Sequence, residues 1–348
     1  MSRNARFQLA LFALFGGFIS AGAADSLPSP ATSAAARVVI VQGETLLHAF
    51  LPDDGRVADA FNRGLTNFTR AADVTAAWRS LVTTNDTVGI KVFSEPGQVS
   101  GSRAAVVAAI ARGLLAAGIP APQIVIWDRH AGDLQRAGFF ELGEKLGIPV
   151  AGAAESGGDE QTFYLPDSPV TGALVWGDHE FGNTNAGVGK KSFVFKLVSR
   201  RLTKIISVVP LMNESSAGVC GHLFSLTLGS VDNIRRFEGS PERLALALPE
   251  IYALPAVGDH VVLNVTDALL GQCQGGPSGY LQFSTVLNQL WFSRDPVALD
   301  TLALQELARE RQREGLPVWP SNAQLYSTAN LLQLGECDPA KIQVEKIP

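Results

Sequence analysis

Three charged residues lie at or just beyond apolar segments that are typical of buried strands. Lys91 lies near the end of one such segment, Asp128 directly follows a second, and Asp267 follows a third. A lysine in an apolar strand must either extend its ammonium group to water or meet an acid. We therefore interpret Lys91 as an electrostatic anchor or acid–base group, and Asp128 and Asp267 as general bases or metal ligands.

Asp128, His130 and Asp267 also have the chemistry of a divalent-metal site, because carboxylate and imidazole groups are common ligands of such ions. The alternative interpretations are that Asp128 caps the next helix and that His130 is a surface loop residue. The chain has three cysteines and no Cys-x-x-Cys pair, so we expect neither an iron–sulfur cluster nor a zinc ribbon. A bridge between Cys220 and Cys273 is one pairing that the cysteine count allows.

Further candidate ligand-binding residues share positions at strand ends, in glycine-rich loops or at helix starts. They are Glu95, Gly101, Ser102, His222, Gly275, Gly276, Asp295 and Asp300. Gly101 and Ser102 precede a predicted helix, with Ser102 as its expected N-cap, and backbone N–H groups there could bind an anion. Asp295 precedes a proline, so its alternative role is a helix N-cap. Asp300 needs a partner if it faces inward.

The elements that must position these residues alternate along the chain, which predicts an α/β fold with a mostly parallel sheet and crossover helices. Strands are expected at 38–41, 88–92, 124–127, 202–210, 261–265 and 290–292, and helices at 53–79, 103–117, 219–228, 241–254, 296–311 and 321–333. Residues 151–190 predict an irregular insertion with short antiparallel strands. After a flexible lead-in at 24–36, we expect a single domain over 37–335.

Residues 1–23 have the three parts of a secretory signal: Arg3 and Arg6, an apolar run, and small residues at 21–23. They predict a cleaved Sec-type signal peptide and a periplasmic or otherwise extracytoplasmic protein. The alternative is an uncleaved anchor, but the run is short for a span, which needs about 20 residues. We expect no stable membrane insertion after cleavage. The net charge of −5 disfavours a nucleic-acid partner.

Several motifs occur in a fixed order, namely Val88–Val92, Ile124–Asp128, Gly218–Gly221, Asn264–Ala268 with Gly275–Pro277, and Asp295–Asp300. Together they make residues 85–310 similar to the uncharacterised domain-of-unknown-function family 362. The resemblance implies candidate site roles for Lys91, Asp128, Asp267, Asp295 and Asp300, but no settled reaction. Many members carry ferredoxin-type cysteine clusters, which this sequence lacks.

Three functions fit these features. The first is an exported enzyme acting on a small polar or anionic molecule in a cleft at the strand carboxyl ends, where parallel α/β sheets bind ligands. The second is a non-catalytic protein of the cell envelope that binds a metal ion or small ligand in the same cleft. The third is a structural or interaction protein.

Overall fold

The computed structural model describes residues 36–165, 191–318 and 321–348. The predicted signal peptide, the lead-in up to residue 35 and positions 166–190 of the predicted insertion lie outside this part. The strands are β1 (Ala36–Gln42), β2 (Leu47–His48), β3 (Leu51–Pro52), β4 (Val88–Lys91), β5 (Ile124–Asp128), β6 (Val150–Gly152), β7 (Gly158–Tyr164), β8 (Ser192–Phe195), β9 (Lys204–Glu214), β10 (Gly218–Val219), β11 (Val261–Gln272), β12 (Ser284–Ser293) and β13 (Ile342–Ile347). The helices are α1 (Asp54–Thr69), α2 (Val74–Arg79), α3 (Gly97–Ser100), α4 (Ala104–Ala116), α5 (Ala131–Arg136), α6 (Phe139–Leu146), α7 (His222–Ser230), α8 (Pro241–Tyr252), α9 (Pro296–Arg313) and α10 (Ala323–Leu331).

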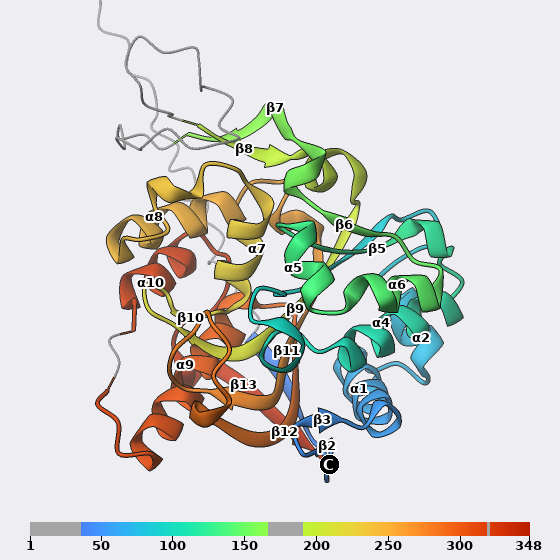
Figure 1. The fold of residues 1–348 in the computed structure, drawn as a ribbon, viewed down its shortest axis with the longest axis horizontal. Helices are drawn as coiled ribbons and strands as arrows, with labels where there is room; N and C mark the ends of the chain where they lie inside the picture. Colours follow the sequence, from blue (N-terminus) through green and yellow to red (C-terminus); the bar gives the residue numbers. More distant parts are fainter. Residues whose placement is uncertain (1–35, 166–190, 319–320) are drawn as a thin grey trace, which may run out of the picture. The chain divides into compact units, whose positions relative to one another are not determined.

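A mostly parallel central sheet confirms the predicted α/β class (Figure 1). Within the described residues it has nine strands in the order β13-β1-β12-β11-β9-β4-β5-β6, with β10 beside β9. The neighbours from β11 to β6 are all parallel, whereas β12 is antiparallel to both β11 and β1. The carboxyl ends of β4, β5 and β9 therefore meet at one edge of the sheet.

Helices cover both faces of this sheet, so its strands are apolar on both sides. Val38 and Ile40 of β1 face a core shared with α7, α8, α9 and α10. Val39 and Val41 face the opposite core, which contains α1, α2 and α4. The alternation follows from the two-residue period of a strand.

Several predicted boundaries shift for local reasons. The helix expected over 53–79 is two helices, because Arg70 adopts a left-handed conformation with φ of 56°. The helix expected from residue 219 begins at His222, because Gly218 and Val219 pair with the end of β9. The strand expected to end at Val265 continues to Gln272. β13 lies beyond residue 335, where we predicted no element.

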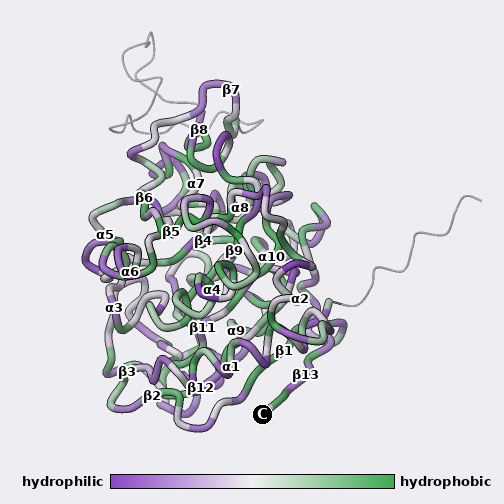
Figure 2. The backbone as a smooth tube through the Cα atoms, turned by 90° about the vertical axis from the view of Figure 1, so that its right-hand side faces the viewer, coloured by the Kyte–Doolittle hydropathy of each residue, from purple (hydrophilic) through white to green (hydrophobic). Residues whose placement is uncertain are grey.

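The predicted insertion is confirmed only in part. β7 lies within 151–190 and belongs to an antiparallel pair, but its partner β8 begins at Ser192, beyond the predicted range. Val150–Gly152 forms β6, a parallel strand of the central sheet, because it pairs with β5. The chain around β7 is hydrophilic (purple in Figure 2). No helix in the described ranges is long and apolar enough to cross a membrane.

Candidate functional site

Lys91 is the last residue of β4, and its side chain is completely buried. Its Nζ lies 2.8 Å from Asp128 Oδ1 and donates to the carbonyl oxygen of Val92 at 2.7 Å and to Ser225 Oγ at 2.9 Å. Nζ also lies 5.6 Å from the centre of the Trp127 ring. An ammonium group has three N–H donors, so these three oxygens satisfy it completely.

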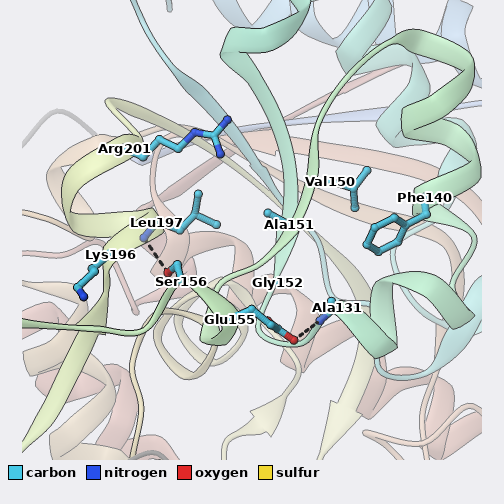
Figure 3. A pocket seen from close by; sticks show the side chains of 10 residues that line it. All are labelled: Ala131, Phe140, Val150, Ala151, Gly152, Glu155, Ser156, Lys196, Leu197 and Arg201. Atoms are coloured by element: carbon cyan, nitrogen blue, oxygen red, sulfur yellow. Dashed lines mark hydrogen bonds between the residues drawn. The ribbon is translucent and has the colours of Figure 1, made fainter. Parts of the chain in front are cut away.

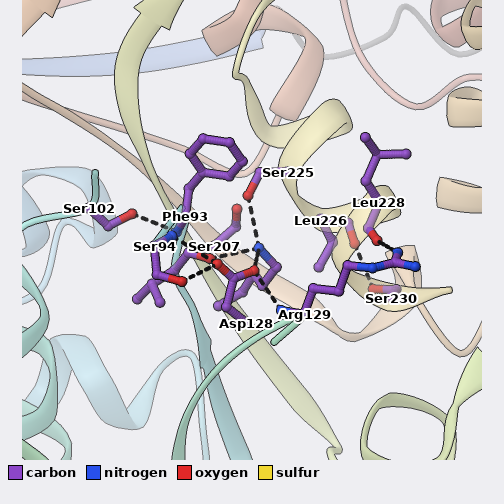
Figure 4. Close-up of polar contacts among 12 residues, drawn as sticks. Phe93, Ser94, Ser102, Asp128, Arg129, Ser207, Ser225, Leu226, Leu228 and Ser230 are labelled. Carbon is purple, nitrogen blue, oxygen red and sulfur yellow. Dashed lines mark hydrogen bonds and ion pairs between the residues drawn. The ribbon is translucent and has the colours of Figure 1, made fainter. Parts of the chain in front are cut away.

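The Asp128 carboxylate at the end of β5 is equally well satisfied (Figure 4). Besides Lys91, Oδ1 accepts from the Arg129 backbone N–H at 2.8 Å. Oδ2 accepts from the backbone N–H and the hydroxyl of Ser94 at 2.8 and 2.6 Å. Asp128 therefore fixes the ammonium group of Lys91 and the loop after β4, and it does not cap α5.

The two pKa values of this pair shift in the same direction for different reasons. Burial lowers the pKa of Lys91, although the Asp128 charge opposes this. Burial by itself raises the pKa of Asp128, but the Lys91 charge and the hydrogen bonds from Lys91 and Ser94 outweigh it and hold the pKa below its usual value. Because a carboxylate with four donors is stabilised in its ionised form, we assign the pair as ammonium and carboxylate.

Helix α7 brings Ser225 to Lys91. His222, Ser225 and Gly229 are spaced by three and four residues, so they share one face of the helix. A Cβ at Gly229 would lie 2.3 Å from Lys91 Cε, so this position leaves room for the lysine. His222 is buried behind them: its ring nitrogens lie 2.8 Å from Ser207 Oγ and 3.1 Å from Thr266 Oγ1. Burial lowers the pKa of His222 to about 3, so the ring is neutral.

A cleft of about 450 Å³ opens directly above the buried pair. It is lined by Phe93, Glu95, Asp128, Arg129, His130, Asp133, Arg136, Glu214, Phe224, Ser225, Leu228, Gly229, Ile234, Glu238 and Pro277. The structure thus brings the predicted residues Glu95, Asp128 and His130 together at the strand carboxyl ends, with Lys91 beneath them. His130 lies exposed at the start of α5.

Most charges in this cleft have partners in the protein. Arg136 forms an ion pair with Asp133, and Arg129 donates to the backbone oxygens of Leu228 and Val231. Glu214 accepts from two backbone N–H groups of the following turn. Glu95 is exposed as a whole residue, but neighbouring atoms partly shield its carboxyl group from water. This desolvation and the negative charges of nearby acidic residues raise its pKa. A carboxyl group with a raised pKa exchanges its proton closer to neutral pH than an ordinary carboxyl group does.

The predicted metal triad of Asp128, His130 and Asp267 is not assembled. Asp267 lies on β11, two strands from Lys91 and three residues further along in register. Its carboxylate pairs with Arg103 Nη1 at 2.7 Å and accepts from the Arg103 backbone N–H at 3.0 Å. No group of three His, Cys, Asp or Glu residues in the described ranges could hold a metal ion. Asp267 is thus neither a metal ligand with Asp128 nor a group lining the cleft.

The backbone N–H groups of Gly101 and Ser102, which were expected to bind an anion, already donate to the carbonyl oxygens of Gly97 and Phe93 at 3.0 and 2.9 Å. Ser102 Oγ accepts from the Phe93 backbone N–H at 2.8 Å and donates to the Val208 carbonyl oxygen at 2.7 Å. It does not cap α4; Arg103 holds that position. A Cβ at Gly101 would lie 2.6 Å from the Phe93 oxygen, so the residue allows close packing of the backbone.

The glycine-rich loop after β11 forms a wall beside the cleft. Gly276 N–H donates to Asn213 Oδ1 at 3.0 Å, and Pro277 lines the cleft. Gly275 has a φ of 88°, which favours glycine. Neither glycine lines the cleft itself. They shape the backbone of the loop that positions Pro277.

Asp295 and Asp300 are helix caps. Asp295 accepts from Ala298 N–H and Glu336 N–H, both at 2.8 Å, as the N-cap of α9. Asp300 accepts from His222 N–H and Leu223 N–H at 2.7 and 3.1 Å and so caps α7. Burial raises its pKa to about 7, against the lowering effect of these two bonds. Neither carboxylate lines the cleft, but Asp300 holds the start of α7, the helix that carries Ser225.

The sequence analysis missed Ser225, Glu238 and the two phenylalanines of the cleft, Phe93 and Phe224. One signal could have indicated Ser225, because it lies three residues after His222 on a predicted helix and therefore shares its face. The aromatic residues carried no such signal, since buried phenylalanines are common in any core.

The three cysteines, all within the described residues, are free. The Cys220–Cys273 bridge is therefore not formed in this structure. Burial raises the pKa of Cys220 well above its usual value, so its thiol is unreactive.

A second hollow, of about 550 Å³, lies beside β6 (Figure 3). Its wall is mainly apolar, with Phe140 and Val150, and its cations Lys196 and Arg201 are exposed. Glu155 is already bound to the Ala131 backbone N–H. This hollow has no buried ion pair among its described lining residues, whereas the cleft has Lys91 with Asp128.

Comparisons with known proteins add little to this geometry. No family model matches the sequence, and no curated protein matches it. A Thermotoga maritima protein, a structural-genomics target of known crystal structure, is similar with a TM-score of 0.38 and 10% identity. The match covers 78% of this chain and 61% of that one, so the chain spans about three fifths of that protein.

Proposed function

We propose that this protein is an enzyme that acts on a small polar molecule in the cleft at the carboxyl ends of β4, β5 and β9. The observation that carries the proposal is a completely buried ammonium group, Lys91, which donates to a hydroxyl, Ser225, that lines the cleft. The proposal includes an extracytoplasmic location, which rests on the signal peptide predicted from residues 1–23. The resemblance to family 362 remains part of the proposal and rests on the order of the motifs.

Ser225 and Glu95 would perform the two chemical tasks. The Ser225 hydroxyl accepts from Lys91, so its own proton is available to an oxygen of the substrate. A buried positive charge behind this donor favours negative charge on that oxygen, as in an oxyanion hole. Glu95, whose pKa is raised by burial and by its acidic neighbours, would act in its ionised form as the base that takes a proton from the substrate. These roles suit a reaction at a carbonyl group, in which the oxygen gains negative charge.

Consumption of substrate tests the proposal directly. Protein lacking residues 1–23 is incubated with a mixture of small polar carbonyl compounds, and each compound is followed by mass spectrometry. We expect wild-type protein to consume at least one of these compounds. Ser225→Ala and Lys91→Met should consume it about 100-fold more slowly, because such groups typically contribute factors of 10²–10⁴ to a reaction rate. Ser327→Ala, an exposed serine on α10, is the matched control. Equal rates for wild type and Ser225→Ala would contradict the proposal.

Binding without turnover is the second candidate. It is favoured by one observation: every N–H of Lys91 and both oxygens of Asp128 already have partners, so neither is free to act as a base. A ligand that raises the melting temperature and is not consumed would favour this candidate over the enzyme.

A further inference from the structure

We infer that the ligand of the cleft is a small amine that also carries an oxygen acceptor and an apolar group. Its ammonium group is neutralised by Glu95 and Glu238, and its oxygen accepts from Ser225. This inference rests on the proposed function of the cleft and names the class of molecule that the cleft takes, which differs from the anionic ligand that the sequence allowed.

The carboxylates of the cleft carry negative charge that the neighbouring cations do not balance. The other acids there are engaged: Asp128 with Lys91, Asp133 with Arg136, and Glu214 in its turn. Among the described residues, neither Glu95 nor Glu238 accepts a hydrogen bond or lies in an ion pair. The charge of Arg129 acts on Glu238 at longer range, but it also acts on Asp232 and Asp128. The five carboxylates that line the cleft therefore outnumber Arg129, Arg136 and the Lys91 beneath them. A bound cation would relieve the repulsion between these two carboxylates, whereas an anion would increase it.

Ser225 gives an independent indication of a ligand. The residue is 2% exposed, lines the cleft, and accepts a hydrogen bond from Lys91. Within the described part of the chain no acceptor receives its hydroxyl proton. A buried donor left without an acceptor is costly, so an oxygen atom of a ligand would complete it.

Apolar groups supply the remaining wall. Phe93 and Phe224 line the cleft with their rings edge to face at 6.4 Å, and Leu228 and Ile234 lie near them. Aromatic faces attract cations as well as apolar groups. The same wall is therefore compatible with an ammonium group that carries an apolar substituent.

Three matched probes test each part of this inference by calorimetry. Phenylalaninamide has the amine, the carbonyl oxygen and the ring; 3-phenylpropanamide lacks the amine, and 2-phenylethylamine lacks the amide. We expect phenylalaninamide to bind at least about 10-fold more tightly than either, a difference of about 1.4 kcal/mol.

Variants then assign the contacts. Glu95→Gln and Glu238→Gln should each weaken the binding of phenylalaninamide about 2–5-fold, as expected for ion pairs that are partly exposed, and leave the binding of 3-phenylpropanamide unchanged. Ser225→Ala should weaken the binding of both amides and leave the binding of 2-phenylethylamine unchanged. Glu144→Gln, an exposed glutamate on α6, is the charge-matched control.

Two results would overturn the inference. One is the absence of phenylalaninamide binding up to its solubility limit. The other is tighter binding of the anion 3-phenylpropanoate than of phenylalaninamide; if that binding is lost in Ser225→Ala, the cleft remains the site and only the amine class is wrong. The proposed enzyme, in contrast, fails when no compound is consumed, whichever probe binds.

Discussion

Two buried ion pairs of this protein use the same chemistry and differ in what surrounds them. Lys91 with Asp128 and Arg103 with Asp267 are both almost completely buried, with atoms 2.8 and 2.7 Å apart. The first pair touches Ser225, which lines a cleft, whereas the second ties β11 to the start of α4. The two pairs therefore differ in access: a hydrogen bond links the first pair to a side chain that lines the cleft, and the second pair has no such link among the described residues.

The largest expected effect is on stability, at the closed pair. Arg103→Met leaves Asp267 buried without its cation, and we expect a loss of about 3–5 kcal/mol in the free energy of unfolding. Denaturation in urea measures it, with Arg112→Met, exposed on the same helix, as control. Binding of phenylalaninamide to the folded protein should not change. Loss of binding would show that the two pairs do not act separately.

A double substitution at the cleft pair should separate its function from its stability. Lys91→Met with Asp128→Asn removes both charges, so stability should fall by less than in Lys91→Met alone. Turnover should still fall about 100-fold, because the charge behind Ser225 is gone. Lys145→Met with Glu141→Gln, an exposed pair on α6, is the control for both measurements. If turnover is retained, the Lys91–Asp128 pair has only a structural role, like the Arg103–Asp267 pair.

Gly229→Ala tests the space that holds Lys91. The new Cβ would lie 2.3 Å from Lys91 Cε, and the lysine cannot move without breaking its three bonds. We expect a loss of about 1–3 kcal/mol, as in other overpacked cores, together with reduced turnover. Gly55→Ala, exposed on α1, should be neutral or slightly stabilising. Unchanged turnover in Gly229→Ala would contradict the need for this lysine position.

The last expected effect is spread over several pH units and arises at Asp300, which caps the helix of Ser225. Burial raises its pKa to about 7 in the folded protein from a usual value of 3.8. The folded state therefore holds a proton that the unfolded chain releases. Its stabilising contribution is present below about pH 4 and is lost as the pH rises through 7, by at most about 1.4 kcal/mol per pH unit.

The difference between wild type and Asp300→Asn isolates this slope, because the opposing contribution of His222 is common to both proteins. Free energies of unfolding at pH 4, 5, 6 and 7 give the measurement. A constant difference across that range would show that Asp300 keeps its usual pKa.

The sequence by itself determined the class of the fold and the position of Lys91 and Asp128. Alternating apolar strands and amphipathic helices are local patterns, and they predict a parallel sheet whose polar residues collect at the strand ends. Element boundaries were wrong for two kinds of reason: another segment pairs with the backbone, as at β10 beside β9, or one residue adopts a left-handed conformation, as Arg70 does at the end of α1.

Only the tertiary structure decided which polar residues act together. Asp128 and Asp267 look alike in sequence, since each follows an apolar run, but one meets Lys91 and the other Arg103. Ser225 is more than a hundred residues from Lys91 in the chain, and the packing of α7 on the sheet brings the two within hydrogen-bonding distance. Spacing along a chain does not specify contacts between distant segments, because these depend on how the helices pack on the sheet.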